Sequence, residues 1–295
     1  MTTDLDEAAA EFAGVRRRLF GIAYRMLGSV HEAEDLIQDV WLKWQAYDRE
    51  TVREPAAFLA TMTTRLAINA TQTARVRRET YIGPWLPEPV DTSADPTLGA
   101  ERGEALELAM LVLLEKLSPT QRAAYILREA FDYPYDQIAE IVQLSEANVR
   151  QLVSRSRKRL GEERREPVDA AEQRRLLEAF LAAAQEGDLA ELVELLAADV
   201  VSYSDGGGIV RASRIPVFGR DHVAKYVASF ASRFWVGSTL TWFQANGRTS
   251  ALAVRDGEAF VAVSISVSAA GIDEVQWLMN PEKLAAVTAQ GPALS

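Results

Sequence analysis

The chain has 295 residues, of which 48% are hydrophobic and 25% charged, so it is ordinary in composition and long enough for two or three compact units. It has no cysteine, which excludes disulfides, a thiol nucleophile and cysteine-ligated zinc or iron–sulfur centres. Its apolar runs are too short to span a bilayer and its acidic first residues are not typical of a signal peptide, so we expect a cytoplasmic protein.

The charge of the chain is unevenly distributed. The formal net charge of -10 argues by itself against a nucleic-acid partner, because phosphates attract cations. Residues 61–80, however, contain four arginines and one glutamate, and residues 145–165 contain seven cationic residues and three glutamates, so their net charges are +3 and +4. These two basic islands in an acidic chain predict a polyanion contact at two points.

Three amphipathic helices are predicted in residues 1–80. Apolar residues recur every three or four positions over 12–27 and 32–45, and Gly28-Ser29 separates the two stretches. Glu54-Pro55 opens the third helix, because proline is favoured in a first helical turn. The side chains expected to face the core from this helix are Phe58, Leu59, Met62, Leu66 and Ile68. The first unit is therefore predicted to be all-α.

A second all-α unit, over residues 98–165, is predicted to contain a helix-turn-helix. Helices are expected at 98–117 and 121–130, with Ser118-Pro119 capping the latter. A helix at 135–142 and a turn at 143–145 precede a longer helix, and Ala139 and Val149 have the spacing that lets two such helices cross closely. Gln143 takes a turn position that often needs glycine for a positive φ, at a cost of roughly 1 kcal/mol.

Residues 168–295 change character and predict an α+β unit. Helices are expected at 173–186, 189–197 and 222–234. Alternating apolar and polar residues indicate strands at 239–244, 250–255, 259–267 and 273–279. Hairpin turns are expected at Asn246-Gly247, Asp256-Gly257 and Ala270-Gly271. Helices followed by a meander of strands are typical of a small cone on a curved sheet.

The longer helix of the helix-turn-helix has a polar face suited to DNA. Arginine pairs bidentately with guanine and Asn or Gln with adenine in the major groove, and cations further along hold phosphates. The candidate residues are Ser145, Asn148, Arg150, Gln151, Ser154, Arg155, Lys158 and Arg159. A solvated basic helix is the alternative, and the helix-turn-helix spacing favours DNA binding over it.

The first basic island suits a distorted or single-stranded backbone, because polar residues at a helix end are followed by cations. Its candidates are Arg65, Asn69, Gln72, Arg75, Arg77 and Arg78. From the residues alone, a solvated helix end explains this island equally well. Asp35, Gln38 and Asp39 form the polar face of the second helix, and such a face is a normal part of any amphipathic helix.

A family resemblance assigns these surfaces. "RRRLFGIAYRMLGSVHEAEDLIQDVWLKW" and "LSPTQRAAYILREAFDYPYDQIAEIVQLSEANVRQLVSRSRKRL" resemble the two conserved regions of RNA polymerase sigma factors of the extracytoplasmic-function group. The resemblance implies core RNA polymerase, through its β′ clamp and β subunit, and promoter DNA as partners. It implies that Asp35, Gln38 and Asp39 bind the β′ clamp, that the first island recognises and melts the minus-ten element, and that the helix from Ser145 reads the minus-thirty-five element. Asn69 departs from the Asp of many relatives, which leaves the details of minus-ten specificity open.

The linker over residues 81–97 has an unusual apolar content. Three prolines forbid a helix, yet Tyr81, Trp85 and Leu86 are apolar or aromatic, and we expect them to pack on the C-terminal domain or on the helical domains. The linker resembles that of a sigma-J-type subgroup with a SnoaL-like extension, which has WLPEP, Asp-Gly-Gly-Gly and Asn-Pro-x-Lys-Leu motifs. The interdomain regulatory residues that this implies are Tyr81, Trp85, Leu86, Pro87, Asp205, Gly206, Gly207, Gly208, Asn280, Pro281, Lys283 and Leu284. Ile209 replaces the Lys that the subgroup has after its glycines.

An enzyme or small-ligand sensor fused to a DNA-binding module is the competing hypothesis. Relatives of the cone fold use Asp or His as acid or base, and the candidates here are Asp205, Asp221, His222 and Asp273. Asp221 is better explained as a helix cap. With two histidines in distant units, we expect no metal, no cofactor and no catalytic residues. Whether the extension activates or inhibits, and whether it binds a small ligand, is left open by the sequence.

Overall fold

The computed structural model describes residues 2–90, 92, 107–163 and 168–290, which belong to two compact units. The helical unit includes Met1–Glu79 and Met110–Glu163. The sheet unit includes Thr80–Pro96, Glu107–Ala109 and Arg164–Ser295, so the described residues of the predicted linker belong to it. The predicted boundaries at residues 97–98 and 165 lie outside the described residues. No helix in the described part of the chain is long and apolar enough to cross a membrane.

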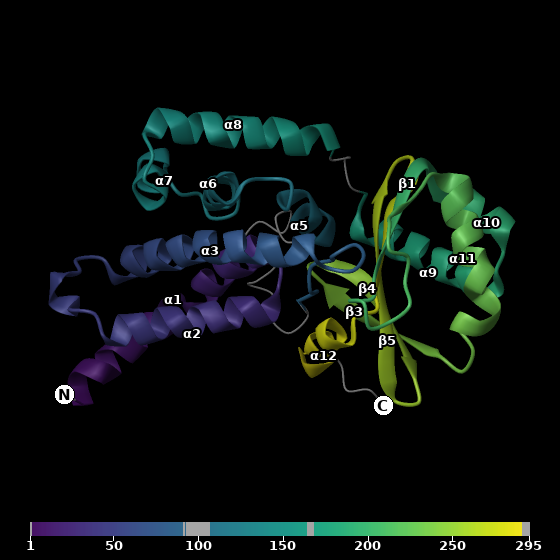
Figure 1. Ribbon diagram of the computed structural model, residues 1–295, viewed down its shortest axis with the longest axis horizontal. Helices are drawn as coiled ribbons and strands as arrows, with labels where there is room; N and C mark the ends of the chain where they lie inside the picture. Colours follow the sequence, from purple (N-terminus) through teal and green to yellow (C-terminus); the bar gives the residue numbers. More distant parts are fainter. Residues whose placement is uncertain (1, 91, 93–106, 164–167, 291–295) are drawn as a thin grey trace. The chain divides into compact units, whose positions relative to one another are not determined.

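Three helices that run side by side form the first part of the helical unit (Figure 1). They are α1 (Thr2–Leu27), α2 (Val30–Gln45) and α3 (Pro55–Glu79), with a 3-10 turn at Arg49–Thr51. The break between α1 and α2 forms as predicted: Gly28 has a φ of 68°, and the Ser29 hydroxyl accepts a hydrogen bond from the backbone of Glu32. This cap satisfies one of the free N–H groups at the start of α2.

The buried face of α3 differs from the expected one. Phe58, Met62, Leu66 and Ile68 are only partly buried, whereas Leu59 is fully buried as expected. Apart from Leu59, the buried face consists of small residues: Ala60, Thr63, Thr64, Ala67, Thr71 and Ala74. Small side chains let α3 approach α1 closely, and the Thr71 hydroxyl bonds to the carbonyls of Ala67 and Met26 at 2.7 and 3.2 Å. Hydrophobicity alone pointed to the wrong face because it gives large side chains more weight than small ones.

The helix-turn-helix is confirmed in the second part of the helical unit. This part contains α5 (Leu108–Leu114), α6 (Pro119–Glu129), α7 (Tyr135–Val142) and α8 (Glu146–Glu163). The helix-turn-helix consists of α7 and α8. Ser118 and Gln121 form a capping box at the start of α6. Gln143 takes the left-handed conformation, with a φ of 57°. The helix expected at 98–117 is shorter in its described part, and residues 98–106 lie outside the described residues.

One mixed sheet organises the second unit. Its strands are β1 (Leu196–Asp205), β2 (Val217–Phe218), β3 (Thr239–Ala245), β4 (Arg248–Arg255), β5 (Glu258–Ser268) and β6 (Gly271–Leu278). The order is β2-β1-β6-β5-β4-β3, with β1 parallel to β6 and the other pairs antiparallel. Both residues of Asn246-Gly247 and of Asp256-Gly257 have positive φ, which is the geometry of tight hairpin turns.

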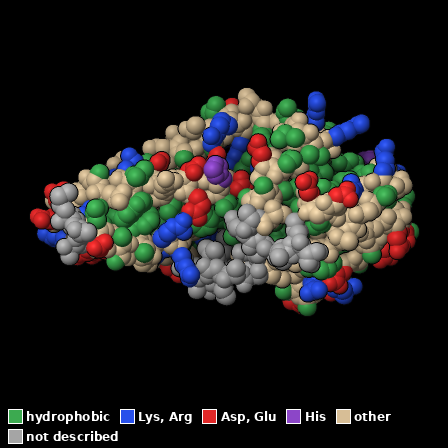
Figure 2. Space-filling view, turned by 90° about the horizontal axis from the view of Figure 1, so that it is seen from below, with side chains coloured by type: hydrophobic (Ala, Val, Ile, Leu, Met, Phe, Trp, Pro, Cys, Tyr) green, Lys and Arg blue, Asp and Glu red, His purple; other side chains and the backbone are tan. Residues whose placement is uncertain are grey.

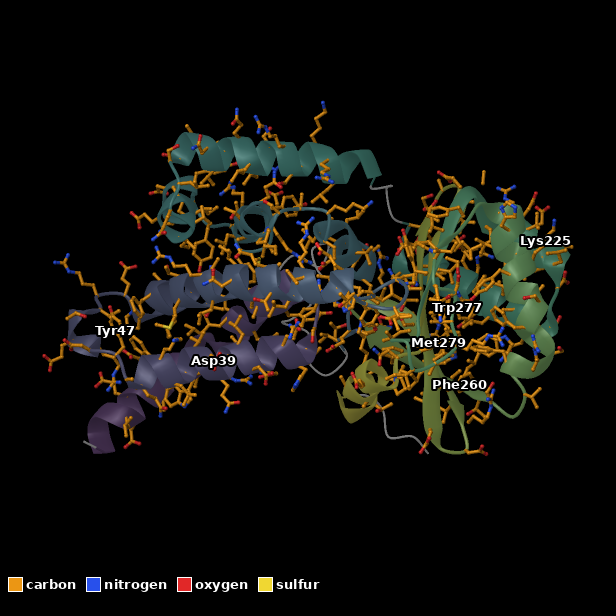
Figure 3. All side chains as sticks on the ribbon, in the orientation of Figure 1. Asp39, Tyr47, Lys225, Phe260, Trp277 and Met279 are labelled. Carbon is orange, nitrogen blue, oxygen red and sulfur yellow. The ribbon has the colours of Figure 1, made fainter. Side chains whose placement is uncertain are left out.

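Four helices accompany the sheet: α9 (Ala170–Glu186), α10 (Leu189–Leu195), α11 (Arg220–Phe234) and α12 (Pro281–Gln290). The first three lie together on one side of it (Figure 1). Trp277 of β6 lies in the core among Phe180, Phe230 and Trp235 (Figure 3). The predicted fold class, two all-α domains followed by an α+β domain, is confirmed.

The sheet unit differs from the sequence expectations in several details. The strands β1 and β2 were not among the four that were expected. Asp221 does not cap α11, because the helix begins at Arg220 and its cap residue is Gly219. The C-terminal helix α12 was not expected. The Asn280 side chain accepts a hydrogen bond from the backbone of Glu282 at 3.0 Å, so the Asn-Pro pair at 280–281 starts a helix.

Candidate functional site

The predicted groove-reading face of α8 is solvent-exposed along its length. Val149 and Val153 are fully buried and fix the orientation of the helix against the rest of the helix-turn-helix. All eight candidates on the other face are exposed: Ser145, Asn148, Arg150, Gln151, Ser154, Arg155, Lys158 and Arg159. Arg150 pairs with Glu146 at 2.5 Å and lies over the Tyr135 ring, which holds it in place at the start of the helix.

The predicted minus-ten candidates follow one another along the C-terminal half of α3. Arg65, Asn69, Gln72, Arg75 and Arg77 are exposed and Arg78 is half-buried. Three of the arginines have partners inside the helical unit. Arg77 pairs with Glu32, Arg78 pairs with Glu115, and Arg65 donates to the carbonyls of Glu140 and Ile141. Arg65 and Arg78 therefore contact the second part of the helical unit, whereas Arg77 pairs within the first part.

The three candidates on α2 share one exposed face. Asp35, Gln38 and Asp39 all point away from the buried stripe that contains Leu36, Ile37 and Val40. His31 lies 3.5 Å from the Asp35 carboxylate. Asp39 lies on α2 in Figure 3. Figure 2 shows acidic and basic side chains interspersed on the face that it draws, so acidic groups are not confined to this helix.

The linker is anchored on the sheet unit by a buried carboxylate. Asp205, at the end of β1, is fully buried and accepts hydrogen bonds from the Tyr81 hydroxyl at 2.6 Å and the Leu86 backbone at 2.9 Å. Lys283 of α12 is also buried, lies 2.7 Å from Asp205, and donates to the Leu86 carbonyl at 2.5 Å. Its ammonium group lies 4.3 Å from the centre of the Trp85 ring. The two residues of one ion pair thus bond to the backbone N–H and to the carbonyl of Leu86.

The remaining motif residues complete this anchor. Asn280 donates to the Tyr81 hydroxyl at 2.9 Å. Gly207 has a φ of 62°, its backbone donates to Asp205 at 3.1 Å, and a Cβ atom there would come within 2.5 Å of Asn280. At Gly208, with a φ of 76°, a Cβ atom would meet Ile82 at 2.9 Å. Glycine is required at both positions because the turn and the linker approach each other so closely.

A second contact fixes the far end of the linker. Residues 86–90 are all buried. Val90 pairs with Asn246 of the β3–β4 turn: its backbone N–H donates to the side chain at 3.0 Å, and its carbonyl accepts from the backbone N–H at 2.9 Å. The Thr92 backbone donates to the Gln244 carbonyl at 2.9 Å. The linker is therefore held at two points along the sheet unit.

Burial decides the electrostatics of the anchor. Burial, the hydrogen bond to Asp205 and the charge of that carboxylate raise the pKa of Tyr81 above its ordinary value, so the hydroxyl stays protonated and donates. An ion pair removed from water is stabilising only when its hydrogen bonds are satisfied. Asp205 and Lys283 meet this condition because each also bonds to the linker backbone.

Several structurally important residues were missed from the sequence. Arg25 and Arg122 are each 1% exposed: Arg25 contacts the Phe131 ring of the second part of the helical unit, and Arg122 pairs with Glu115. Arg25 follows Ile22 by three residues, so it falls on the apolar face predicted for α1, and that position is a usable signal. Nothing in the local pattern marks Glu115 as the partner of Arg78, and the Asn246-Gly247 turn was predicted without its bond to Val90, because these partners are distant in sequence.

Comparison with known families defines the class of protein. Residues 12–78 match the model of Sigma-70 region 2, and residues 107–160 match that of Sigma-70 region 4. We call these segments region 2 and region 4. A protein with both is a sigma factor, which acts with core RNA polymerase and promoter DNA in transcription initiation.

The chain belongs to the extracytoplasmic-function (ECF) RNA polymerase sigma factors. It is 36% identical over 235 residues to the ECF RNA polymerase sigma factor SigJ of Mycobacterium tuberculosis, covering 77% of this chain and 74% of that protein. It is 28% identical over 285 residues, 95% of each chain, to the same species' probable ECF RNA polymerase sigma factor SigI. The crystal structure of M. tuberculosis SigJ matches with a TM-score of 0.76 and 31% identity, covering 97% of this chain and 99% of that one. The sheet unit is therefore part of a shared architecture.

Proposed function

We propose that the three surfaces divide the work of a sigma factor. The exposed α2 face with Asp35, Gln38 and Asp39 binds the β′ clamp of the polymerase. The α3 island binds the minus-ten element, and α8 binds the minus-thirty-five element in the major groove. The protein works in the cytoplasm, where polymerase and promoter are found. The exposure of all eight α8 candidates supports the last assignment.

The clamp assignment is tested by replacing the three α2 residues together with alanine. Because all three are exposed, the fold should stay intact, and the affinity for purified core polymerase should fall by about a hundredfold or more. Binding is measured by native gel shift of labelled protein, with circular dichroism as the control for folding. Unchanged affinity in the folded variant would refute the assignment.

We also propose that the sheet unit regulates the sigma factor in cis by holding the linker between regions 2 and 4. The carrying observation is the buried Asp205–Lys283 pair that bonds to both the N–H and the carbonyl of Leu86. A linker tied down at Leu86 and Val90 is shorter and stiffer than a free one, which changes how far apart the two DNA-binding regions can move. We propose that docking of the linker on the sheet unit lowers the transcription that the sigma factor supports.

Run-off transcription with core polymerase tests this restraint. Lys283→Met removes the Leu86 bond and leaves Asp205 without its cation, so the linker should detach and transcript should rise by about threefold to tenfold. Glu178→Gln, which breaks an exposed pair with Arg174 on α9, is the matched control and should change nothing. A loss of transcript from the folded Lys283→Met variant would instead show that the docked linker supports promoter binding.

An enzymatic role for the sheet unit is disfavoured by the same geometry. Asp205, one of the acid–base candidates, is fully buried and satisfied by the linker. Asp221 and His222 are exposed at the start of α11, and the His222 ring lies 3.2 Å from the Phe218 carbonyl. At the edge of the core, the partly buried Phe230, Phe234 and Phe260 pack ring against ring. We therefore propose a regulatory domain without catalytic activity.

A further inference from the structure

Region 4 accepts hydrogen bonds from Arg65, an arginine that we assign to minus-ten binding. Arg65 of α3 donates from Nε to the Ile141 carbonyl at 3.0 Å and from Nη2 to the Glu140 carbonyl at 2.9 Å. Both acceptors lie in the last turn of α7, where carbonyls are free of helical partners and carry partial negative charge. An arginine binds a phosphate bidentately through two such parallel N–H groups. Arg65 therefore cannot donate from Nε and Nη2 to these carbonyls and to a phosphate at the same time.

A second arginine of the same island is tied to region 4 by an ion network. Arg78, at the end of α3, pairs with Glu115, and Glu115 lies 2.6 Å from Arg122 of α6. Burial alone would raise the pKa of Glu115, but the charges of Arg122 and Arg78 and their hydrogen bonds hold that pKa below its ordinary value. The carboxylate is therefore charged between two guanidinium groups, and it competes directly with phosphate for Arg78.

Aromatic side chains of region 4 also contact arginines of α1. The Phe131 ring lies 5.0 Å from the Arg25 guanidinium, and the Tyr133 ring lies 4.8 Å from that of Arg18. Both rings are buried, at 8% and 7% exposure. The Phe131 ring rests over Gly21 of α1, where an added Cβ atom would meet it at 3.2 Å. A side chain at this glycine therefore requires Phe131 and the end of Arg25 to shift.

We infer that region 4 is an intramolecular competitor for the minus-ten surface. The helical unit is a closed form, and region 4 must leave α3 before Arg65 and Arg78 can bind DNA. This inference rests on the proposed role of these two arginines in promoter binding. The groove-reading face of α8 stays exposed in the closed form, so closure blocks one DNA-binding surface and leaves the other accessible.

Closure should weaken the binding of the free protein to single-stranded DNA. When only a fraction of molecules is open, the apparent dissociation constant rises by the inverse of that fraction. A variant that opens the unit without touching the DNA-binding residues should therefore bind more tightly, by up to about tenfold if one molecule in ten is open.

Two glycines of α1 provide a matched pair of variants. Gly21→Ala places a methyl group 3.2 Å from the Phe131 ring and 2.9 Å from the end of the Arg25 side chain, so Phe131 must shift and its packing on α1 should weaken. It also raises the helix propensity of α1, so region 2 itself should not be weakened. Gly14→Ala, in the same helix, has nothing within 4 Å of the added Cβ atom and is the control. Glu115→Gln is an independent opening variant, because it removes the charge that holds Arg78.

The absence of cysteine from the sequence makes site-specific labelling simple. Cysteines replacing exposed Ala46 in region 2 and Gly161 at the end of α8 carry a donor and an acceptor dye, and Gly161 has open space for the new side chain. Energy transfer is measured on the full chain, alone and with a single-stranded oligodeoxynucleotide. Binding of the same probe to the unlabelled variants is measured by anisotropy at one fixed salt concentration, because phosphate binding depends strongly on salt.

Gly21→Ala and Glu115→Gln should change energy transfer and bind the probe more tightly, and Gly14→Ala should behave as the unmodified chain. Saturating probe should shift the unmodified chain toward the transfer value of the opened variants. Unchanged transfer in both opening variants would overturn the closed form. Changed energy transfer without tighter probe binding would refute the minus-ten role of Arg65 and Arg78, and with it the competition between region 4 and DNA. The closed form itself would stand in that case, so the two failures can be told apart.

Discussion

The two basic islands of the chain have similar charge and different surroundings. On α3, Arg65, Arg77 and Arg78 all have partners within the helical unit. On α8, Arg150 pairs with Glu146 of the same helix, and Arg155 and Arg159 are exposed on a helix that Val149 and Val153 anchor from the other side. The comparison teaches that the net charge of a stretch does not decide whether it can bind a polyanion. The partners of each cation decide it.

Burial separates the arginines further, and it predicts the largest effect on stability. Arg122 is buried beside Glu115, so Arg122→Ala removes one of the two guanidinium partners of a partly buried carboxylate and should lower the free energy of unfolding by about 3 kcal/mol. Arg157 pairs with Glu129 at the surface, and Arg157→Ala should cost at most about 1 kcal/mol. Urea unfolding of both variants measures the difference. Equal losses would show that the region 2 and region 4 contact depends little on the buried pair.

An intermediate effect is expected for DNA binding by α8. Replacing Arg155 and Lys158 with alanine should leave the free energy of unfolding within about 0.5 kcal/mol, since both side chains are exposed. It should weaken promoter binding by polymerase holoenzyme by about 1–3 kcal/mol, because base and phosphate contacts are lost. Footprinting on a minus-thirty-five element is the readout. Arg174→Ala, at an exposed ion pair of the sheet unit, is the control for loss of a surface charge.

Local rules predicted most of the fold. Periodicity and caps located α2, α6 and α7, and the Asn-Gly and Asp-Gly pairs located two hairpins of the sheet unit. The buried face of α3 was predicted incorrectly because Ala and Thr pack it, and close approach of two helices is a tertiary property. The parallel pairing of β1 with β6 joins strands about 75 residues apart, which no local pattern specifies.

The candidate site was predictable in parts. The exposed face of α8 followed from its amphipathic pattern, and the WLPEP linker was marked by its apolar content. The buried Asp205–Lys283 pair and its bonds to Leu86 join three distant segments, so only the resemblance to the subgroup brought their motifs together. Arg65 was predicted as a DNA-binding residue, but its bond to the end of α7 depends on how two helical regions pack.

The pH dependence of stability around Glu115 sharpens the contrast between buried and exposed cations. The pKa of Glu115 is held below its ordinary value of 4.5 in the folded protein, so its charge stabilises the fold above that pH. Protonation as the pH falls through the folded pKa removes this stabilisation. Glu115→Gln lacks the charge at every pH. The stability difference between the unmodified chain and this variant should therefore be greatest near pH 7 and shrink below pH 4.5, as measured by urea unfolding across that range. A difference that stays constant with pH would show that the loss comes from packing, and that Arg78 and Arg122 do not depend on the Glu115 charge to hold region 4 against α3.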